Sequence, residues 1–236
     1  MKIIVVMPTY NEAENLPKMV AALLSLKAGE LEIVVVDDNS PDGTGDIADQ
    51  LSRQYPSKLH IIHRERKLGL GTAYVAGFRL ALEKGADYVI EMDADFSHSP
   101  SYIPMLLAAV KECDVVVGSR YVPGGGVRGS WGAWRRFLSW AGNLYARLAT
   151  GLKVRDTTGG FKCFHKEVLQ NLDLARIGSG GYAFQIEMAY LCQMEGYEVR
   201  EVPIIFEDRA AGSSKMSLGI VWEAIWRVPQ LRFKYR

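Results

Sequence analysis

Residues 88–100 read YVIEMDADFSHSP, an apolar run that leads into two carboxylates, Asp93 and Asp95. We expect a strand over residues 88–95. Side chains alternate across a strand, so both acids would point to one side, with Cα atoms roughly 6.5 Å apart, and Ala94 would face away. Two like charges this close repel each other. The stretch therefore predicts either a cation between the two acids or a proton on one of them.

Similar apolar runs alternate with helical patterns through the first half of the chain. We expect strands at residues 2–7, 32–38, 60–63, 88–95 and 114–120, and helices at 17–26, 43–54, 71–85 and after Pro100. Continuous apolar strands separated by helices indicate an α/β fold, with a mainly parallel sheet flanked by helices on both faces. In such sheets, ligands bind at the carboxyl ends of the strands.

Polar loops follow four of these strands at that edge. Their sequences are PTYNE (8–12), DDNSPDGT (37–44), DADFSHSP (93–100) and SRY (119–121). Each one alone has an ordinary explanation as a turn or a helix cap. Because the carboxyl ends of parallel strands meet at one edge, the four loops together predict a functional site.

The pattern changes after about residue 123. A turn-rich connection, PGGGVRGSWG, precedes an expected helix at 131–150, and the segment RDTTGGFKCF (155–164) is expected to be a loop. A helix at 182–196, a strand at 197–206 and a loop at 207–217 follow. We expect this half to complete a single domain, residues 1–216, and residues 217–236 to form a C-terminal amphipathic helix.

The overall composition excludes several classes of protein. A formal charge of +1 gives no broad basic field, so nucleic acid is not an expected partner. Cys113, Cys163 and Cys192 form no CxxC pair, which is typical of free thiols in a reducing compartment and favours a cytoplasmic location. No apolar run is long enough to span a membrane.

The two acids suit a hard divalent cation. Two carboxylates without nearby cysteine ligands favour Mg²⁺ or Mn²⁺ shared with the phosphates of a substrate. His98 is expected to support the site rather than to bind the metal.

Seven motifs in order carry a family resemblance: PTYNE, DDNSPDGT, GLGTAY, DADFSHSP, SRY, TGGF and EDRAAGSSK. Over residues 3–216 the chain resembles the inverting family 2 glycosyltransferases of GT-A fold, and most closely the dolichol-phosphate (polyprenol-phosphate) mannosyltransferases. The resemblance implies transfer of mannose from GDP-mannose to a polyprenyl phosphate at the cytoplasmic face of a membrane, and allows for a small membrane-anchoring subunit. Another nucleotide sugar, such as UDP-glucose, or a hydroxyl acceptor is the alternative.

The resemblance also assigns roles to residues. Asp93 and Asp95 would bind the metal, and Arg120 and Arg135 the acceptor phosphate. Some relatives have Gln where Ser97 stands, so no ligand role carries over to Ser97. The residues expected to bind the donor are Pro8, Tyr10, Glu12, Val36, Asp38, Asp93, Ala94, Asp95, Arg120, Arg209 and Lys215. The residues expected to act in catalysis are Asp95, Arg120, Arg209 and Lys215.

The acceptor's own chemistry decides whether a base is needed. A phosphate monoester has a second pKa of about 6 and is largely dianionic at neutral pH, so it needs cations rather than a base. Arg209 and Lys215 lie in a small-residue loop that is expected to close over the donor. A hydroxyl acceptor would need a carboxylate base, for which Glu187 and Asp156 are the candidates; each could equally be a buried or capping carboxylate.

Two helices have apolar faces rimmed by Trp and Arg, at about 131–150 and in the C-terminal segment. Such faces suit either a membrane interface or core packing. We favour the membrane interface for at least one of them, because the implied acceptor is a lipid.

Two other classes of protein fit part of the sequence. A signalling receiver module could use Asp37 and Asp38 as an acidic pair, but it leaves residues 123–236 and Asp95 unexplained. A non-catalytic nucleotide-sugar-binding protein would not need both acids and the Arg209–Lys215 loop.

Overall fold

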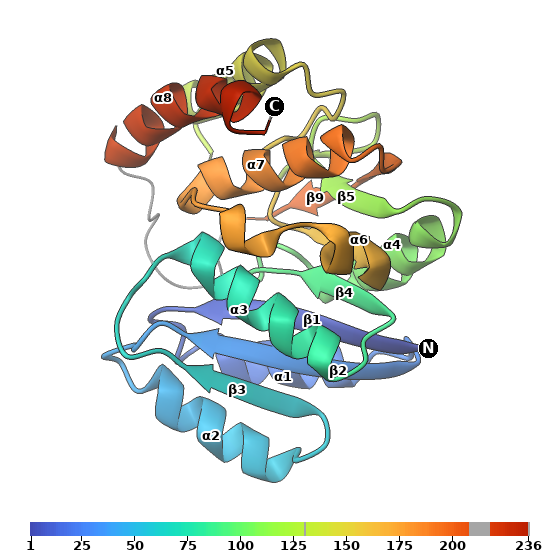
Figure 1. The fold of residues 1–236 in the computed structure, drawn as a ribbon. Helices are drawn as coiled ribbons and strands as arrows, with labels where there is room; N and C mark the ends of the chain where they lie inside the picture. Colours follow the sequence, from blue (N-terminus) through green and yellow to red (C-terminus); the bar gives the residue numbers. More distant parts are fainter. Residues whose placement is uncertain (130, 208–217, 236) are drawn as a thin grey trace.

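The computed structural model describes residues 1–129, 131–207 and 218–235 (Figure 1). A seven-stranded sheet with the order β3-β2-β1-β4-β7-β5-β8 forms its centre. Every strand in it is parallel to the others except β7, which runs antiparallel between β4 and β5. Its strands are β1 (Lys2–Thr9), β2 (Glu30–Asp37), β3 (Leu59–His63), β4 (Tyr88–Glu91), β5 (Val115–Ser119), β7 (Lys162–His165) and β8 (Val199–Pro203). The short strands β6 (Gly126–Val127) and β9 (Ile205–Phe206) pair in parallel as a second sheet.

Helices cover both faces of the large sheet (Figure 1). The α-helices are α1 (Leu16–Leu24), α2 (Thr44–Gln54), α3 (Leu70–Glu83), α4 (Ile103–Ala109), α5 (Ala133–Thr150), α6 (Lys166–Asn171), α7 (Gly181–Met194) and α8 (Leu218–Lys234). Short 3₁₀ turns occupy Pro100–Tyr102, Val110–Glu112 and Leu174–Arg176. Prolines in the first turns of α1 and α4 suit positions where a helix needs no backbone N–H donor.

The alternation of side chains along β1 divides the core in two. Val5 packs with α1 and α4 in one cluster, whereas Val6 packs with α3 and α7 in the other. Both residues are completely buried, which explains why the strands read as continuous apolar runs rather than as alternating ones. The expected α/β architecture is confirmed.

Two expectations about the strands were wrong. Strand β4 ends at Glu91 rather than at residue 95, so Asp93 and Asp95 lie in a loop and the strand alternation does not place them. The segment 155–164, expected to be a loop, contains the start of β7. Because β4 and β5 are both antiparallel to β7, they run parallel to each other, and their carboxyl ends still open at the same edge.

Helices α5 and α8 pack against α7 outside the sheet (Figure 1). Their shared core includes Ala146 of α5, Ile186 of α7, and Val228 and Leu231 of α8. On α5, large apolar side chains remain exposed: Trp134, Phe137, Leu138, Trp140, Tyr145 and Leu148. Among the described residues, no helix is long and apolar enough to cross a membrane.

Candidate active site

A cavity of about 330 Å³ opens at the carboxyl ends of β1, β2 and β4. Its walls also include the start of α3 and the start of α7, so both halves of the chain contribute. The residues that line it are Pro8, Thr9, Tyr10, Glu12, Asp38, Lys67, Gly69, Leu70, Asp93, Ala94, Asp95, Thr158, Gly160, Gly181, Tyr182 and Gln185. This is the edge at which the polar loops were expected to meet.

A tight turn holds the Asp95 carboxylate. Asp95 Oδ1 accepts hydrogen bonds from the Ser97 backbone N–H (3.0 Å) and the Ser97 hydroxyl (2.5 Å). Phe96 between them has φ of 63°, a left-handed conformation that costs a non-glycine residue about 1–3 kcal/mol. The turn thus fixes the direction of a carboxylate that is buried in the cavity wall.

Asp93 is more accessible than Asp95. The Asp93 side chain is 36% exposed, whereas Asp95 is buried. The Tyr74 hydroxyl donates to Asp93 Oδ1 at 3.3 Å. Burial and the charge of Asp93 raise the pKa of Tyr74, so its hydroxyl keeps the proton that it donates.

His98 contacts the backbone of the same loop. Its ring stacks on Phe161, and its Nδ1 accepts a hydrogen bond from the Asp93 backbone N–H at 3.4 Å. Burial lowers the pKa of His98 to about 4, so the ring is neutral at physiological pH. The expectation that His98 supports the site agrees with this position.

The residues of this loop fit a divalent cation that is shared with a ligand. Both carboxylates line one cavity, and two oxygen-donating side chains leave Mg²⁺ or Mn²⁺ coordination positions for phosphate oxygens and water. Across the described ranges, no group of three or more His, Cys, Asp or Glu side chains could hold a metal by itself. A metal at this site would be held by the two carboxylates together with oxygen ligands from a substrate or from water.

Asp37 and Asp38 have different tasks at the end of β2. Asp37 accepts hydrogen bonds from Thr9 and Ser40 and so ties the β1 and β2 loops together. Asp38 lines the cavity, pairs with Arg64 at 2.7 Å and accepts a hydrogen bond from the Gly69 N–H. The two acids thus have different partners. This arrangement does not match a receiver module, in which both acids would bind one ion.

The loop after β3 brings a cation to the cavity. Lys67 Nζ lies 3.7 Å from the centre of the Tyr10 ring, and both residues line the cavity. A cation on an aromatic face is attracted by the ring quadrupole. Lys67 was not among the expected site residues, although its loop follows a parallel strand whose carboxyl end lies at the same edge.

Arg120 does not face this cavity. Its guanidinium is buried and forms a two-pronged ion pair with Asp156: Nη2 lies 2.6 Å from Oδ1 and Nε 2.8 Å from Oδ2. Arg120 Nη2 also donates to Thr158, which lines the cavity. Burial alone would raise the pKa of Asp156, but the Arg120 charge and hydrogen bonds hold it below its ordinary value.

A buried network lies behind the far wall. Lys162 donates to Gln185, to the Gly159 carbonyl (2.6 Å) and to Glu91 (3.2 Å). Because Lys162 holds the Gln185 oxygen, the Gln185 amide group is fixed where it lines the cavity. Neither Lys162 nor Gln185 was expected in the site. Lys162 lies in β7 and Gln185 in α7, and only the fold brings these two segments together behind the cavity.

Most of the expected donor residues come together. Pro8, Tyr10, Glu12, Asp38, Asp93, Ala94 and Asp95 all line the cavity. Val36 does not: its side chain is completely buried in the core beside Gly77, so only its backbone could serve a ligand. Arg135 lies on α5, with its guanidinium 4.1 Å from the centre of the Trp131 ring. Arg209 and Lys215 lie outside the described residues.

Both candidate bases are occupied by structural bonds. Asp156 is completely buried against Arg120. Glu187 is also completely buried, and its carboxylate accepts hydrogen bonds from Lys234 (2.6 Å), Tyr235 (2.7 Å) and the Ser179 N–H (3.0 Å). The geometry favours the interpretation of both as structural carboxylates.

This mainly parallel sheet, with a cavity at its carboxyl edge and two acids after β4, is typical of glycosyltransferases of GT-A fold. Residues 4–173 match the model of Glycosyl transferase family 2, and the chain belongs to this family. The family resemblance of the sequence motifs is confirmed.

Curated relatives align over nearly the whole chain. An undecaprenyl-phosphate mannosyltransferase from Micrococcus luteus is 47% identical, covering 97% of this chain and 93% of the relative. A polyprenol monophosphomannose synthase from Mycolicibacterium smegmatis is 44% identical, covering 96% and 85%.

Solved structures share the fold at lower identity. A glucosyl-3-phosphoglycerate synthase from Mycobacterium tuberculosis, bound to Mn²⁺, UDP and phosphoglyceric acid, has a TM-score of 0.65 at 21% identity, covering 99% of this chain and 76% of that one. A mannosyltransferase from Pyrobaculum calidifontis, bound to GDP-Man and Mn²⁺, has a TM-score of 0.60 at 17% identity, covering 98% and 73%. The GT-A fold is confirmed.

Proposed function

We propose that the protein transfers mannose from GDP-mannose to the phosphate of a polyprenyl lipid, with inversion at the sugar carbon. The names of the two curated relatives support the sugar and the acceptor class. The observation that carries the proposal is the placement of Asp93 and Asp95 beside Tyr10 and Asp38 in one cavity. That arrangement suits a nucleotide diphosphate-sugar bound through a divalent cation.

The reaction is a single displacement. An oxygen of the acceptor phosphate forms a bond to C1 of mannose as the bond from C1 to the GDP oxygen breaks, and GDP leaves with both bonding electrons. Attack from the face opposite the leaving group inverts the configuration. Because the acceptor is already an anion, no proton must be removed, which agrees with the structural roles of Asp156 and Glu187.

The chain's own residues bind and orient the donor in this proposal. Asp93 and Asp95 would hold Mg²⁺ or Mn²⁺, which would offset the charge that develops on the departing GDP. Tyr10 and Asp38 would hold the nucleoside, and Lys67 would place a positive charge nearby. Gln185, fixed by Lys162, would contact the sugar.

Cations are assigned to the phosphates of both substrates. Arg135 would meet the acceptor phosphate, and Arg209 and Lys215 would close over the donor diphosphate. Arg120, which is paired with Asp156, would act by positioning Thr158 at the cavity wall. The division into a catalytic unit, residues 1–216, and a C-terminal helix, residues 217–236, is part of the proposal.

We place the protein at the cytoplasmic face of a membrane, as a peripheral protein. The exposed aromatic side chains of α5 support this placement, because Trp residues beside Arg suit a membrane interface. A small membrane-anchoring subunit is compatible with it.

The proposal is tested by incubating the protein with radiolabelled GDP-mannose and Mg²⁺ or Mn²⁺, with and without a short polyprenyl phosphate. We expect label in the organic extract only when both the metal and the lipid are present. Release of GDP with a free sugar acceptor, without labelled lipid, would contradict it. Replacing GDP-mannose by UDP-glucose tests the alternative donor.

A further inference from the structure

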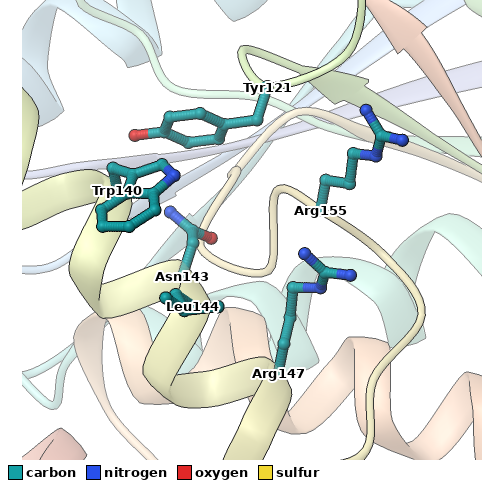
Figure 2. Close-up of a pocket in the computed structure, with 6 residues that line it drawn as sticks. All are labelled: Tyr121, Trp140, Asn143, Leu144, Arg147 and Arg155. Carbon is teal, nitrogen blue, oxygen red and sulfur yellow. The ribbon is translucent and has the colours of Figure 1, made fainter.

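A second cavity, of about 300 Å³, lies against α5 and is separate from the active site (Figure 2). Its lining residues are Tyr121, Trp140, Asn143, Leu144, Arg147 and Arg155. None of them lines the donor cavity. In Figure 2 the two guanidinium groups lie on one side of the cavity and the rings of Tyr121 and Trp140 on the other.

Neither arginine side chain forms an ion pair with another described residue, although the Glu201 carboxylate accepts a hydrogen bond from the Arg155 backbone N–H. The Arg147 Nε is buried, and no hydrogen-bond acceptor reaches it within the part of the chain that the structure describes. The side chain of Arg155 is exposed and likewise forms no ion pair there. Two guanidinium groups that share a cavity without an acid repel each other, and a buried donor without an acceptor costs free energy. An anion between them would relieve both costs.

Guanidinium geometry selects the kind of anion. Its planar fork matches the oxygens of phosphate or carboxylate with two parallel hydrogen bonds, and two forks together suit a phosphate group. Asn143 and Tyr121 also line the cavity, but Asn143 bonds to Thr157 and Thr158, and the Tyr121 hydroxyl donates to Ser139. The arginines are therefore the anion-binding groups of the cavity.

An exposed aromatic row leads along α5 into the cavity. The ring centres of Trp134 and Phe137 lie 5.7 Å apart, and those of Phe137 and Trp140 lie 6.1 Å apart. Half or more of each residue is exposed, although the three lie side by side on one helix. Contiguous exposed apolar surface of this kind marks an interaction site. A ligand with a phosphate in the cavity could lay an apolar chain along the row.

We propose that this cavity binds the phosphate group of an anionic membrane lipid that is not consumed in the reaction. The lipid phosphate lies between Arg147 and Arg155, and its chains lie against Trp140. Asn143 of this cavity bonds to Thr158 of the donor cavity, so these two side chains form part of the wall between the cavities, which share no lining residue. A phosphate held there is not placed to attack a donor, so the site anchors the protein to a lipid surface.

Flotation with vesicles tests the proposal without donor or acceptor, so its outcome does not depend on the proposed transfer reaction. The probes are vesicles of phosphatidylcholine alone and of phosphatidylcholine with phosphatidylglycerol. We expect wild type to bind the second kind more tightly, and each arginine to contribute about fivefold, so that Arg147→Ala/Arg155→Ala loses about 25-fold. If the double variant bound phosphatidylglycerol vesicles as tightly as wild type does, the proposal would be overturned.

Three control variants separate a site from general electrostatics. Arg53→Ala removes a charge from α2, at the other end of the molecule from α5 (Figure 1), and should leave vesicle binding unchanged. Arg147→Lys/Arg155→Lys keeps both charges but loses the guanidinium forks, and we expect weaker binding than wild type. Equal binding by wild type and the double lysine variant would contradict a built site. Because Arg155 is exposed, Arg155→Glu gives a folded variant that should abolish the preference for phosphatidylglycerol.

Two further measurements identify the source of the phosphate. Inorganic phosphate, added to the flotation assay in excess, should compete only weakly, because it lacks the apolar chains. Full competition would overturn the lipid assignment in favour of a soluble phosphate ligand. Transfer to a short-chain acceptor in detergent should be unchanged in Arg147→Ala/Arg155→Ala; a parallel loss of this activity would overturn the assignment by making the cavity part of the acceptor site.

Discussion

Asp156 holds Arg120 through both of its carboxylate oxygens, at 2.6 and 2.8 Å, and also accepts a hydrogen bond from the Arg120 backbone N–H at 2.9 Å. The pair joins the end of β5 to the segment before β7. The Arg120 side chain also donates a hydrogen bond to Thr158 at the cavity wall. Arg120, which the sequence analysis expected to contact a ligand, therefore acts on the site through Thr158.

Removing one member of this pair should be costly. Asp156→Asn leaves the buried Arg120 charge without its counterion, and we expect a loss of about 3–5 kcal/mol in the free energy of unfolding. Chemical denaturation measures it. Arg200→Ala breaks two exposed ion pairs, with Glu112 and Glu198, and should have little effect. Equal effects of the two substitutions would contradict a structural role for Asp156.

The close contact of α3 with β1 depends on Gly77. A Cβ at this position would collide with Val6 and press on Val36. Gly77→Ala should therefore lower stability by about 1–3 kcal/mol through overpacking.

Gly142 of α5 gives the matched control for Gly77. No atom lies within 4 Å of a Cβ built there. Because glycine disfavours a helix, Gly142→Ala should raise stability by about 0.5–1 kcal/mol. The two substitutions should thus shift the melting temperature in opposite directions. A rise in melting temperature for both substitutions would show that backbone entropy, rather than the Val6 contact, governs Gly77.

Glu187 attaches the end of α8 to α7 and should make that attachment pH-dependent. Burial alone would raise its pKa, but the hydrogen bonds from Lys234 and Tyr235 hold it below its ordinary value. Its stabilisation is thus fully present above the unfolded pKa of about 4.3 and is lost as the pH falls through the lower folded pKa. The stability difference between wild type and Glu187→Gln should be constant from neutral pH to about pH 5 and then narrow. A difference that is the same at every pH would contradict it.

Patterns that repeat along the chain were predictable from the sequence. The buried strands β1 and β2 and the meeting of their loops at one edge followed from continuous apolar runs and the rule for parallel sheets. That rule also covers the loop after β3, and applying it there would have found Lys67. The signal was the presence of three basic residues among the four that directly follow HIIH.

Contacts between distant segments were not predictable. Strand β7 has four residues, one of them the charged Lys162, and it pairs with β4 and β5 only after the chain has passed through α5. Lys162 can be buried because Glu91 and Gln185 accept its hydrogen bonds. Both partners are distant in sequence, so the local sequence around Lys162 does not predict them. The pairing of Arg120 with Asp156 was missed for the same reason.

The proposed roles of Arg209 and Lys215 predict a difference between turnover and binding. If these cations act mainly as the charge on the departing GDP develops, Arg209→Ala and Lys215→Ala should lower kcat far more than donor affinity. Steady-state kinetics together with equilibrium binding of GDP-mannose separates the two. Equal losses in kcat and affinity would refute the assignment.

Metal dependence tests the paired acids most directly. Asp95→Asn keeps the size of the side chain and its acceptor oxygen but removes a charge. Changing a group that only supports a metal ligand costs about 10–100-fold in metal affinity or activity, so loss of a direct ligand should cost at least about 100-fold in turnover at fixed Mn²⁺.

Tyr74→Phe provides the graded comparison for Asp95→Asn, because it removes only the hydrogen bond to Asp93 Oδ1. We expect a higher Mn²⁺ concentration for half-maximal activity, with near-normal turnover when the metal is saturating. Titrating Mn²⁺ against activity and against GDP binding, for wild type and both variants, separates these effects. If Asp95→Asn retained the wild-type metal requirement, the carboxylates would not be holding the cation, and the active-site proposal would fail at its central step.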